Sequence, residues 1–317
     1  MLFFICSVYG ACAARPAAPT EIKRKLLNMT IREITRIDLH MHSTVSDGTD
    51  APEEILIRVR EAGIGLFSIT DHDAMSECAR IRSLLAPGDP VFLNGVEFSC
   101  RDREGKYHIL GYGFDPGGIS MRDVVEKGHR LRMEKAAERL DRLRTEFGFS
   151  FPEEEIRRLM ALNNPGKPHI GNLMVKYGYA ENREAAIREY IDRVKTQAEY
   201  IRPEEAIEGI LRGGGIPVLA HPPFGSGRDA ICGVDLDRRL RRLMDFGLRG
   251  LEGFYSGYTP QMTGEMLSLA EKYGLYVTAG SDYHGRNKQV ILGDTHFDPA
   301  QKIPDGLRRF LEDVRLG

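Results

Sequence analysis

The sequence predicts an α/β fold, a distorted (β/α)7 TIM-like barrel that carries an inserted helical subdomain. Three observations lead to this prediction. Short apolar runs alternate with segments of helical periodicity along most of the chain, which is typical of parallel strands joined by helices. Residues 119–200 break the alternation, because they are charged and helical and contain no convincing strand. No glycine-rich dinucleotide loop is present.

Seven short apolar runs are expected to be strands. These runs are residues 37–39, 66–69, 91–98, 107–112, 216–220, 250–254 and 275–279. Helical periodicity is found in residues 52–62, 75–85, 203–211, 236–245 and 261–273. Pro52 and Pro203 suit the first turn of a helix, where the backbone N–H has no partner. Because helices separate the strands, the strands are expected to be parallel.

The barrel is expected to comprise residues 31–118 and 201–317, and the helical insertion, residues 119–200, is expected to lie over the active site. Residues 121–147 can form one long amphipathic helix. Residues 1–30 are expected to be an N-terminal extension, disordered or upstream of the true start, for which Met29 is the candidate. A secretion signal at residues 1–14 is the alternative, and the lack of a basic leader counts against it.

The composition limits the partners that the chain can bind. Its 44 Lys and Arg residues oppose 46 Asp and Glu residues, which gives a formal net charge of -2. No general basic field exists for long nucleic acid, so phosphate recognition is expected to be local. The five cysteines lack CxxC spacing, which favours free thiols and a cytoplasmic location. No membrane partner is expected, and the oligomeric state is left open.

Nine side chains of metal-binding type are found, and nearly all of them lie at the end of an expected strand or in the turn after it. They are His40, His42, Asp47, His72, Glu97, His108, His221, Asp282 and His284. Residues two apart on a strand face the same side, so His40 with His42, and Asp282 with His284, form two pairs that can each chelate an ion. Strand ends and the loops after them converge at one mouth of a barrel, where the nine side chains are expected to meet.

The donors are imidazoles and carboxylates without sulfur, which suits catalytic Mn, Fe or Zn better than structural zinc. Nine ligands exceed what two ions with open positions require, so three divalent metal ions with one bridging carboxylate are expected. Taken singly, His108 could instead be packed in its strand, and Asp71 or Asp73 could cap a helix. The order and placement of the whole set favour a metal cluster.

Six motifs resemble those of the polymerase and histidinol phosphatase (PHP) family of metal-dependent phosphoesterases. They are Asp38-Leu39-His40-Met41-His42-Ser43, Ser46-Asp47-Gly48-Thr49, Thr70-Asp71-His72-Asp73, Gly95-Val96-Glu97, Ala220-His221-Pro222 and Gly280-Ser281-Asp282-Tyr283-His284. The resemblance implies three metal sites: His40, His42, Glu97 and Asp282; Glu97, His108 and His221; and Asp47, His72 and His284. It implies that Glu97 bridges the first two sites. The expected catalytic residues are Asp73, Glu97 and His221.

The expected reaction is hydrolysis of a phosphate ester by a metal-activated hydroxide. Chain length and the helical insertion resemble the subgroup that hydrolyses nucleoside 3',5'-bisphosphates and trims short RNA from its 5' end. A small phosphorylated substrate, a nucleotide or short RNA, is therefore expected. The alternatives are a cyclic sugar or nucleotide phosphate, histidinol phosphate, and a metal-binding module without turnover.

Cations are required to bind the substrate phosphate. The candidates are Lys167, His169, Arg132 and Arg228, together with Arg130. The alternative is that these side chains are ordinary solvated charges. Tyr255 and Tyr258, near a strand end, could stack on a base or pack in the core.

Overall fold

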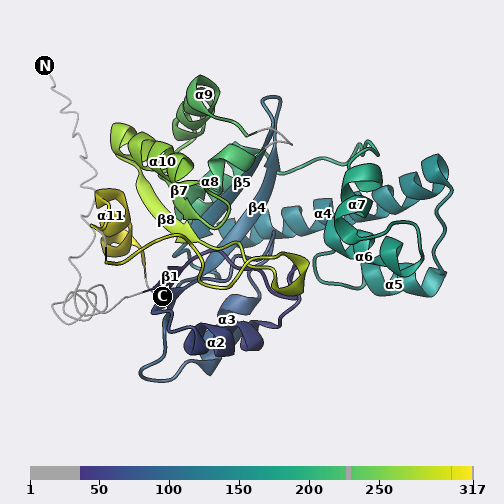
Figure 1. The fold of residues 1–317 in the computed structure, drawn as a ribbon, viewed down its shortest axis with the longest axis horizontal. Helices are drawn as coiled ribbons and strands as arrows, with labels where there is room; N and C mark the ends of the chain where they lie inside the picture. Colours follow the sequence, from purple (N-terminus) through teal and green to yellow (C-terminus); the bar gives the residue numbers. More distant parts are fainter. Residues whose placement is uncertain (1–35, 226–229, 301, 316–317) are drawn as a thin grey trace, which may run out of the picture. The chain divides into compact units, whose positions relative to one another are not determined.

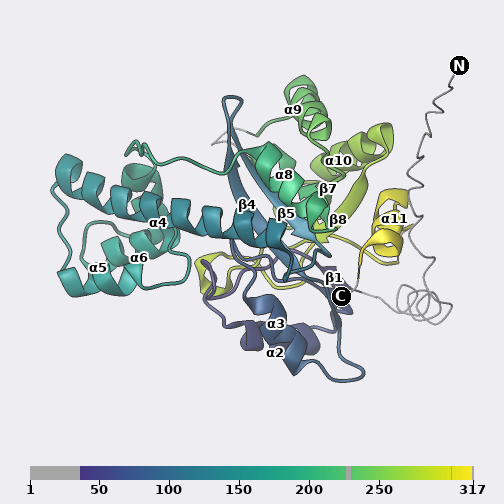
Figure 2. The same cartoon turned by 180° about the vertical axis from the view of Figure 1, so that it is seen from behind.

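The computed structural model of the chain describes residues 36–225, 230–300 and 302–315, which form a mixed α/β fold (Figures 1 and 2). The expected N-terminal extension, with the alternative secretion signal and the candidate start at Met29, lies outside the described residues, and so does Arg228. No helix among the described residues combines the length and apolar character needed to cross a bilayer.

The described strands are β1 (Ile37–Asp38), β2 (Leu66–Phe67), β3 (Val91–Phe92), β4 (Gly95–Arg101), β5 (Lys106–Tyr112), β6 (Ile216–Leu219), β7 (Gly250–Tyr255) and β8 (Tyr276–Gly280). The described α-helices are α2 (Pro52–Glu61), α3 (Glu77–Leu84), α4 (Ile119–Phe147), α5 (Glu153–Met160), α6 (Lys167–Lys176), α7 (Arg183–Ala186), α8 (Pro203–Arg212), α9 (Gly233–Asp245), α10 (Pro260–Tyr273) and α11 (Asp305–Asp313). Shorter helical turns are η1 (Ile187–Ile191), η2 (Pro222–Phe224) and η3 (Gly285–Asn287).

The strands form two sheets. A parallel sheet has the order β1-β2-β3, and a mixed sheet has the order β4-β5-β6-β7-β8. Isolated bridges link the two, one between Met41 and Tyr283 and another between His72 and Glu97. Within the described residues the continuous ladders do not close, so the structure supports the expected α/β class but not a complete barrel. Both bridges involve or adjoin the predicted metal ligands.

The expected single strand over residues 91–98 is wrong. The run is interrupted at Asn94 and forms β3 and β4, which belong to different sheets. The Asn94 side chain donates to the backbone oxygen of Phe114 (3.1 Å) and accepts from the guanidinium of Arg82 (2.8 Å). This polar side chain therefore anchors a buried bend inside an otherwise apolar run.

The expectation that every strand is parallel is also wrong for β5, which runs antiparallel to β4 and β6. Only residues 102–105 join β4 to β5, and a connection this short permits a hairpin but no crossover helix. The Asp102 side chain stabilises the turn by accepting hydrogen bonds from the backbone N–H groups of Glu104 (2.8 Å) and Gly105 (3.2 Å).

The helices expected between the strands are confirmed, with ends shifted by at most a few residues. α2 and α8 both begin at proline, and a glutamate in the first turn of each accepts a hydrogen bond from the residue before the helix. Thr259 caps α10 through its hydroxyl oxygen, which accepts from the backbone N–H of Met262 (3.3 Å).

Residues 119–191 are predominantly helical, and α4 is the longest of these helices (Figures 1 and 2). The C-terminal half of α4 packs with α5, α6 and α7 around a separate hydrophobic cluster. Its buried members are Leu140, Leu143, Phe151, Leu159, Ile170, Leu173, Met174, Ala186, Ile191 and Val194.

The N-terminal half of α4 lies against α8 and the loop after β2. At Gly128 a Cβ atom would stand 2.8 Å from Ile201 Cδ1 and 2.9 Å from Asp73 Cβ, so glycine permits this close approach.

Candidate metal centre

All nine predicted ligands come together in the structure. They fall into four overlapping groups in which one donor atom per residue lies within 4.8 Å of the others. The groups are His42, Asp47, His72 and His284; His40, His42 and Glu97; His40, His221 and Asp282; and His72, Glu97 and His108. Eight of the nine residues are buried or nearly so, and His108 is the most exposed, with a side chain 33% exposed.

Glu97 lies at the centre of the cluster. Its Oε1 atom is 2.8 Å from His108 Nδ1 and 3.3 Å from His221 Nε2. Its Oε2 atom is 3.1 Å from His72 Nδ1, 3.2 Å from His42 Nε2 and 3.4 Å from His40 Nε2. The two oxygens thus face different sets of histidines, which is the placement that a bridging carboxylate requires.

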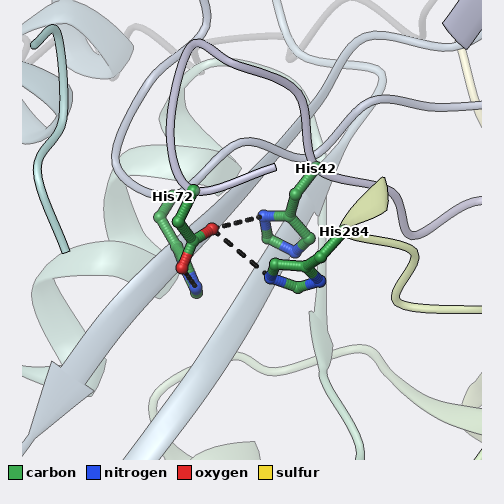
Figure 3. A group of neighbouring side chains, drawn as sticks. His42, His72 and His284 are labelled. Carbon is green, nitrogen blue, oxygen red and sulfur yellow. Dashed lines mark ion pairs between the residues drawn. The ribbon is translucent and has the colours of Figure 1, made fainter. Parts of the chain in front are cut away.

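The second carboxylate, Asp47, faces a different side of the cluster. Figure 3 shows His42, His72 and His284 of this group, which come from separate segments and point toward one another. Asp47 Oδ1 lies 3.3 Å from His284 Nε2 and 3.6 Å from His42 Nδ1, and Asp47 Oδ2 lies 3.8 Å from His72 Nε2.

The third carboxylate, Asp282, divides its two oxygens between different partners. Oδ1 is 3.4 Å from His42 Nε2 and 3.6 Å from His40 Nε2. Oδ2 accepts hydrogen bonds from the hydroxyl of Tyr255 (2.9 Å) and from the ammonium of Lys288. Tyr255 is therefore a partner of a candidate ligand, and its buried position favours the packing alternative over base stacking.

Sequence reasoning missed Glu252, which lies on β7 and is fully buried. Its carboxylate accepts a hydrogen bond from His40 Nδ1 (3.0 Å) and another from the backbone N–H of His221 (2.8 Å). A carboxylate that binds one ring nitrogen of a histidine leaves the other free to face a metal. The only sequence signal is an acidic residue inside an apolar run, Leu251-Glu252-Gly253.

The backbone around the cluster adopts unusual conformations. Asp73, His221 and Asp282 have φ angles of 50°, 26° and 58°, a region that residues other than glycine rarely adopt. His221 precedes Pro222, which disfavours the right-handed helical region for the histidine. At Gly280 a Cβ atom would overlap His40 and the Glu252 carboxylate, so the close packing there requires glycine.

His108 reaches the cluster by a route different from the predicted one. It stands near the start of β5, opposite Ser99 of β4. Because β5 is antiparallel, the start of this strand lies at the same end of the sheet as the later residues of β4. The predicted position of the side chain at the cluster is therefore found although the predicted strand direction is not.

The charges in the cluster are complementary. Burial by itself would raise the pKa of Glu97, but the surrounding imidazoles of His108, His72 and His40 outweigh burial and hold the pKa well below its usual range. Burial would lower the pKa of His40, but the carboxylates of Glu252 and Glu97 raise it well above the ordinary value. The carboxylates are thus kept ionised by nearby positive charge, the state in which they bind cations.

The donor set fits divalent metal ions. Four buried ring nitrogens make no well-aligned hydrogen bond among the described residues: His40 Nε2, His42 Nε2, His108 Nδ1 and His221 Nδ1. The first three face a Glu97 oxygen at 3.4, 3.2 and 2.8 Å, and His221 Nδ1 has no such contact. A buried polar atom without a partner costs about 1–3 kcal/mol, a cost that coordination of a metal removes. Imidazole and carboxylate donors without thiolate suit Zn, Mn or Fe at a catalytic centre.

The predicted phosphate-binding cations occupy different environments. Arg132 of α4 is buried and donates to Asp73 Oδ2 from Nε (3.0 Å) and Nη2 (2.7 Å). Lys167 forms an ion pair with Asp192. His169 Nδ1 accepts from the backbone N–H of Gly166 (3.0 Å) at the start of α6. Arg130 is exposed and pairs with Glu134 (3.3 Å), as expected of a solvated charge.

A cavity of about 200 Å³ adjoins the metal centre. Three candidate ligands, Asp47, His72 and His108, line it together with two predicted phosphate-binding residues, Arg132 and Lys167. Three further cations line the same cavity and were missed in the sequence. They are Lys106, Lys135 and Arg139.

No family model matches the chain. Three curated relatives are each 28% identical to it. They are a phosphoribosyl 1,2-cyclic phosphate 1,2-diphosphodiesterase from Eggerthella lenta (80% of this chain and 95% of the relative), a 3',5'-nucleoside bisphosphate phosphatase from Chromobacterium violaceum (79% and 88%), and the 5'-3' exoribonuclease Rnm from Salmonella typhimurium (83% and 90%).

Two solved structures are similar to the described fold, each with 25% sequence identity. One is an amidohydrolase from Chromobacterium violaceum with bound sulfate and no metal, which has a TM-score of 0.76 and matches 89% of this chain and 98% of its own. The other is a proposed metal-dependent phosphoesterase from Bifidobacterium adolescentis, which has a TM-score of 0.74 and matches 87% and 96%.

Proposed function

We propose that this chain, a metal-dependent phosphoesterase of the PHP type, hydrolyses phosphate esters of nucleotides: 3',5'-bisphosphates or short 5'-phosphorylated oligoribonucleotides. The observation that carries the proposal is the convergence of nine imidazole and carboxylate side chains beside a cavity lined by cations. Two of the three relatives described above act on nucleotides or RNA, which supports this substrate class.

The nine side chains would hold up to three divalent ions of Mn, Fe or Zn, with Glu97 between two of them. When bound, such ions activate water for attack on phosphorus and stabilise the negative charge of the transition state. Arg132 and Lys167, which line the cavity, would bind oxygens of the phosphate group. Asp73 would act by holding the Arg132 guanidinium, because two hydrogen bonds from Arg132 end on its Oδ2 atom.

Two other predicted roles belong to the same proposal. Glu97 and His221 would be catalytic through the ions they bind. His169 would position the start of α6, next to Lys167, because its Nδ1 atom already accepts a backbone hydrogen bond. The barrel also remains a proposal: the bridges Met41–Tyr283 and His72–Glu97 support a distorted seven-stranded form into which residues 119–200 are inserted.

The test is hydrolysis of an aryl phosphate by purified protein supplied with Mn, Fe or Zn. We expect turnover with at least one ion and its loss in His40→Ala. The matched control is His296→Ala, an exposed histidine that belongs to none of the four groups. Absence of hydrolysis with all three ions would favour a binding module without turnover.

A substrate panel then separates the enzymatic alternatives. It compares adenosine 3',5'-bisphosphate, 5'-phosphorylated dinucleotides, cyclic phosphates and histidinol phosphate. The cyclic phosphates belong in the panel because one relative of equal identity is a cyclic phosphate diesterase. The highest kcat/KM for a cyclic phosphate or for histidinol phosphate would replace the proposed substrate class.

A further inference from the structure

Three cations lie along one buried face of α4. Arg132, Lys135 and Arg139 are spaced by three and four residues, so they occupy the same side of the helix. Their exposed fractions are 8%, 5% and 9%. With a rise of about 1.5 Å per residue, Arg139 stands roughly 10 Å along the helix from Arg132. All three line the cavity beside the metal centre.

These cations differ in their partners. Arg132 is paired with Asp73. Within the part of the chain that the structure describes, no ion pair joins Lys135 or Arg139 to a carboxylate. The nearest aromatic partner is Tyr200, whose ring centre lies 3.6 Å from Lys135 Nζ. An aromatic ring attracts a cation but does not neutralise it.

Buried cations without a counter-ion are costly, because desolvation is not offset by an opposite charge. The cost is visible at Lys135, where burial and the neighbouring Arg132 guanidinium lower the pKa to about 7. Burial also lowers the pKa of Arg139. The carboxylates close by are already used, since Asp73 binds Arg132 and Asp192 binds Lys167. Asp73 also acts on Lys135, and Asp192 on Arg139, so each of these carboxylates is shared between two cations. A bound anion would supply the further negative charge.

The cavity connects these cations to the metal centre. Lys106, on β5, lines the cavity as well. Burial and the nearby charge of Lys167 lower the pKa of Lys106. Asp47, His72 and His108 line the cavity too. An anion bound at Lys135 and Arg139 would thus share one cavity with the phosphate that is hydrolysed.

We propose that Lys135, Arg139 and Lys106 form a second anion subsite, which binds a phosphate group of the substrate other than the group that is cleaved. This inference rests on the proposed function and narrows its substrate class to compounds with two separated phosphate groups. Guanidinium and ammonium groups suit phosphate oxygens, and Arg139 can bind two of them at once.

The test compares adenosine 3',5'-bisphosphate with adenosine 3'-monophosphate as substrates for Lys135→Met and Arg139→Met. We expect KM for the bisphosphate to rise about 10- to 100-fold, because each variant loses a hydrogen bond to a charged group. KM for the monophosphate should change less than about 2-fold, because the monophosphate lacks the second phosphate. The kcat values for both substrates should also change less than about 2-fold. Arg144→Met is the matched control, an exposed arginine on the same helix.

Folding is checked by thermal unfolding. Both methionine variants should have a Tm at or above that of the wild type, because each removes an unpaired buried charge. A variant that fails to fold is replaced by Lys106→Met, whose side chain is less buried.

The outcomes separate the two proposals. If the bisphosphate is hydrolysed but the variants leave the ratio of the two KM values unchanged, the subsite is wrong and the proposed function stands. If wild type hydrolyses neither compound, the bisphosphate part of the proposed function fails, and calorimetric binding of adenosine 5'-monophosphate decides the subsite. Binding by the wild type and Arg144→Met but not by Arg139→Met supports it. Equal binding by all three, or none by the wild type, overturns it.

Discussion

At the scale of single residues, one buried carboxylate orients two candidate metal ligands. Glu252 accepts from the ring of His40 and from the backbone of His221. The hydrogen bond at His40 Nδ1 directs Nε2 toward Glu97 and Asp282, at 3.4 Å and 3.6 Å. The bond at His221 holds a residue whose backbone φ of 26° is unfavourable.

Replacing Glu252 should weaken metal binding without removing a ligand. In Glu252→Gln the partner of His40 loses its charge, so we expect metal affinity to fall about 10- to 100-fold. The measurement is metal content after dialysis, together with activity as a function of Mn concentration. Activity should recover at high Mn. The control is Glu271→Gln, an exposed glutamate on α10. Unchanged affinity would show that Glu252 does not position His40.

The buried Lys135 predicts a pH effect on stability. The groups facing it are Arg132 and Arg139 of α4, Asp73, Cys100 of β4 and Tyr200. Its pKa is about 7 in the folded chain, against an ordinary value of 10.5. The unfolded chain therefore binds more protons at this lysine between these pH values, and its contribution to the free energy of unfolding rises with pH there.

Lys135→Met should consequently be more stable than wild type below about pH 7, and this advantage should shrink as pH rises toward 10.5. Denaturant unfolding of both proteins at pH 6, 8 and 9.5 measures the difference. Comparison with wild type at each pH cancels the titration of groups that the two proteins share. A constant difference across this range would contradict the lowered pKa.

At the scale of elements, the direction of β5 and the docking of α4 decide which side chains reach the centre. His108 is expected at the mouth with the other ligands, and it lies there on the first half of an antiparallel strand. Residues 99–106, which separate the two expected strands, are the available sequence signal, because they are too few for a crossover helix. The apolar pattern predicts where the strands lie but does not predict their direction.

The position of α4 depends on Gly128. An alanine there would place Cβ 2.9 Å from Asp73 Cβ and 2.8 Å from Ile201 Cδ1. Alanine gains about 1 kcal/mol of helix propensity, but overpacking costs about 1–3 kcal/mol, so we expect a net loss of stability. Displacing α4 should also disturb the Arg132–Asp73 pair and raise KM.

Gly264→Ala is the matched control, because Gly264 lies inside α10 with nothing within 4 Å of the added Cβ. It should stabilise the protein by up to about 1 kcal/mol and leave KM unchanged. Denaturant unfolding and steady-state kinetics measure both variants. If Gly128→Ala behaves like Gly264→Ala, α4 does not require the close approach.

At the scale of the whole molecule, residues far apart in the chain supply a centre that the sequence predicts in part. The nine expected ligands converge because most of them follow or end a strand, a relation that strand prediction captures, whereas Glu97 lies within β4 and His108 near the start of β5. Glu252, Lys135 and Arg139 were missed because a lone buried charge has no local pattern: only the assembled fold shows what surrounds it. The division of the strands into two sheets was also not predicted, because it depends on backbone hydrogen bonds that side-chain patterns do not specify.

Removal of divalent ions should destabilise the folded protein. A ligand that binds only the folded state stabilises it by RT ln(1 + [L]/Kd), about 2.7 kcal/mol at 100 times Kd. We therefore expect chelation to lower Tm, and addition of Mn, Fe or Zn to restore it, as followed by scanning calorimetry. His40→Ala should respond less than wild type. Identical melting with and without chelator would argue against a metal centre in the folded chain.

The left-handed backbone at Asp73, His221 and Asp282 has a consequence for protein engineering. Glycine would relax the strain at each position and delete a side chain proposed to hold a metal ion or an arginine. Selection for thermostability of the metal-free protein would thus favour the loss of activity, and any directed-evolution campaign on this scaffold needs a screen for turnover at every round.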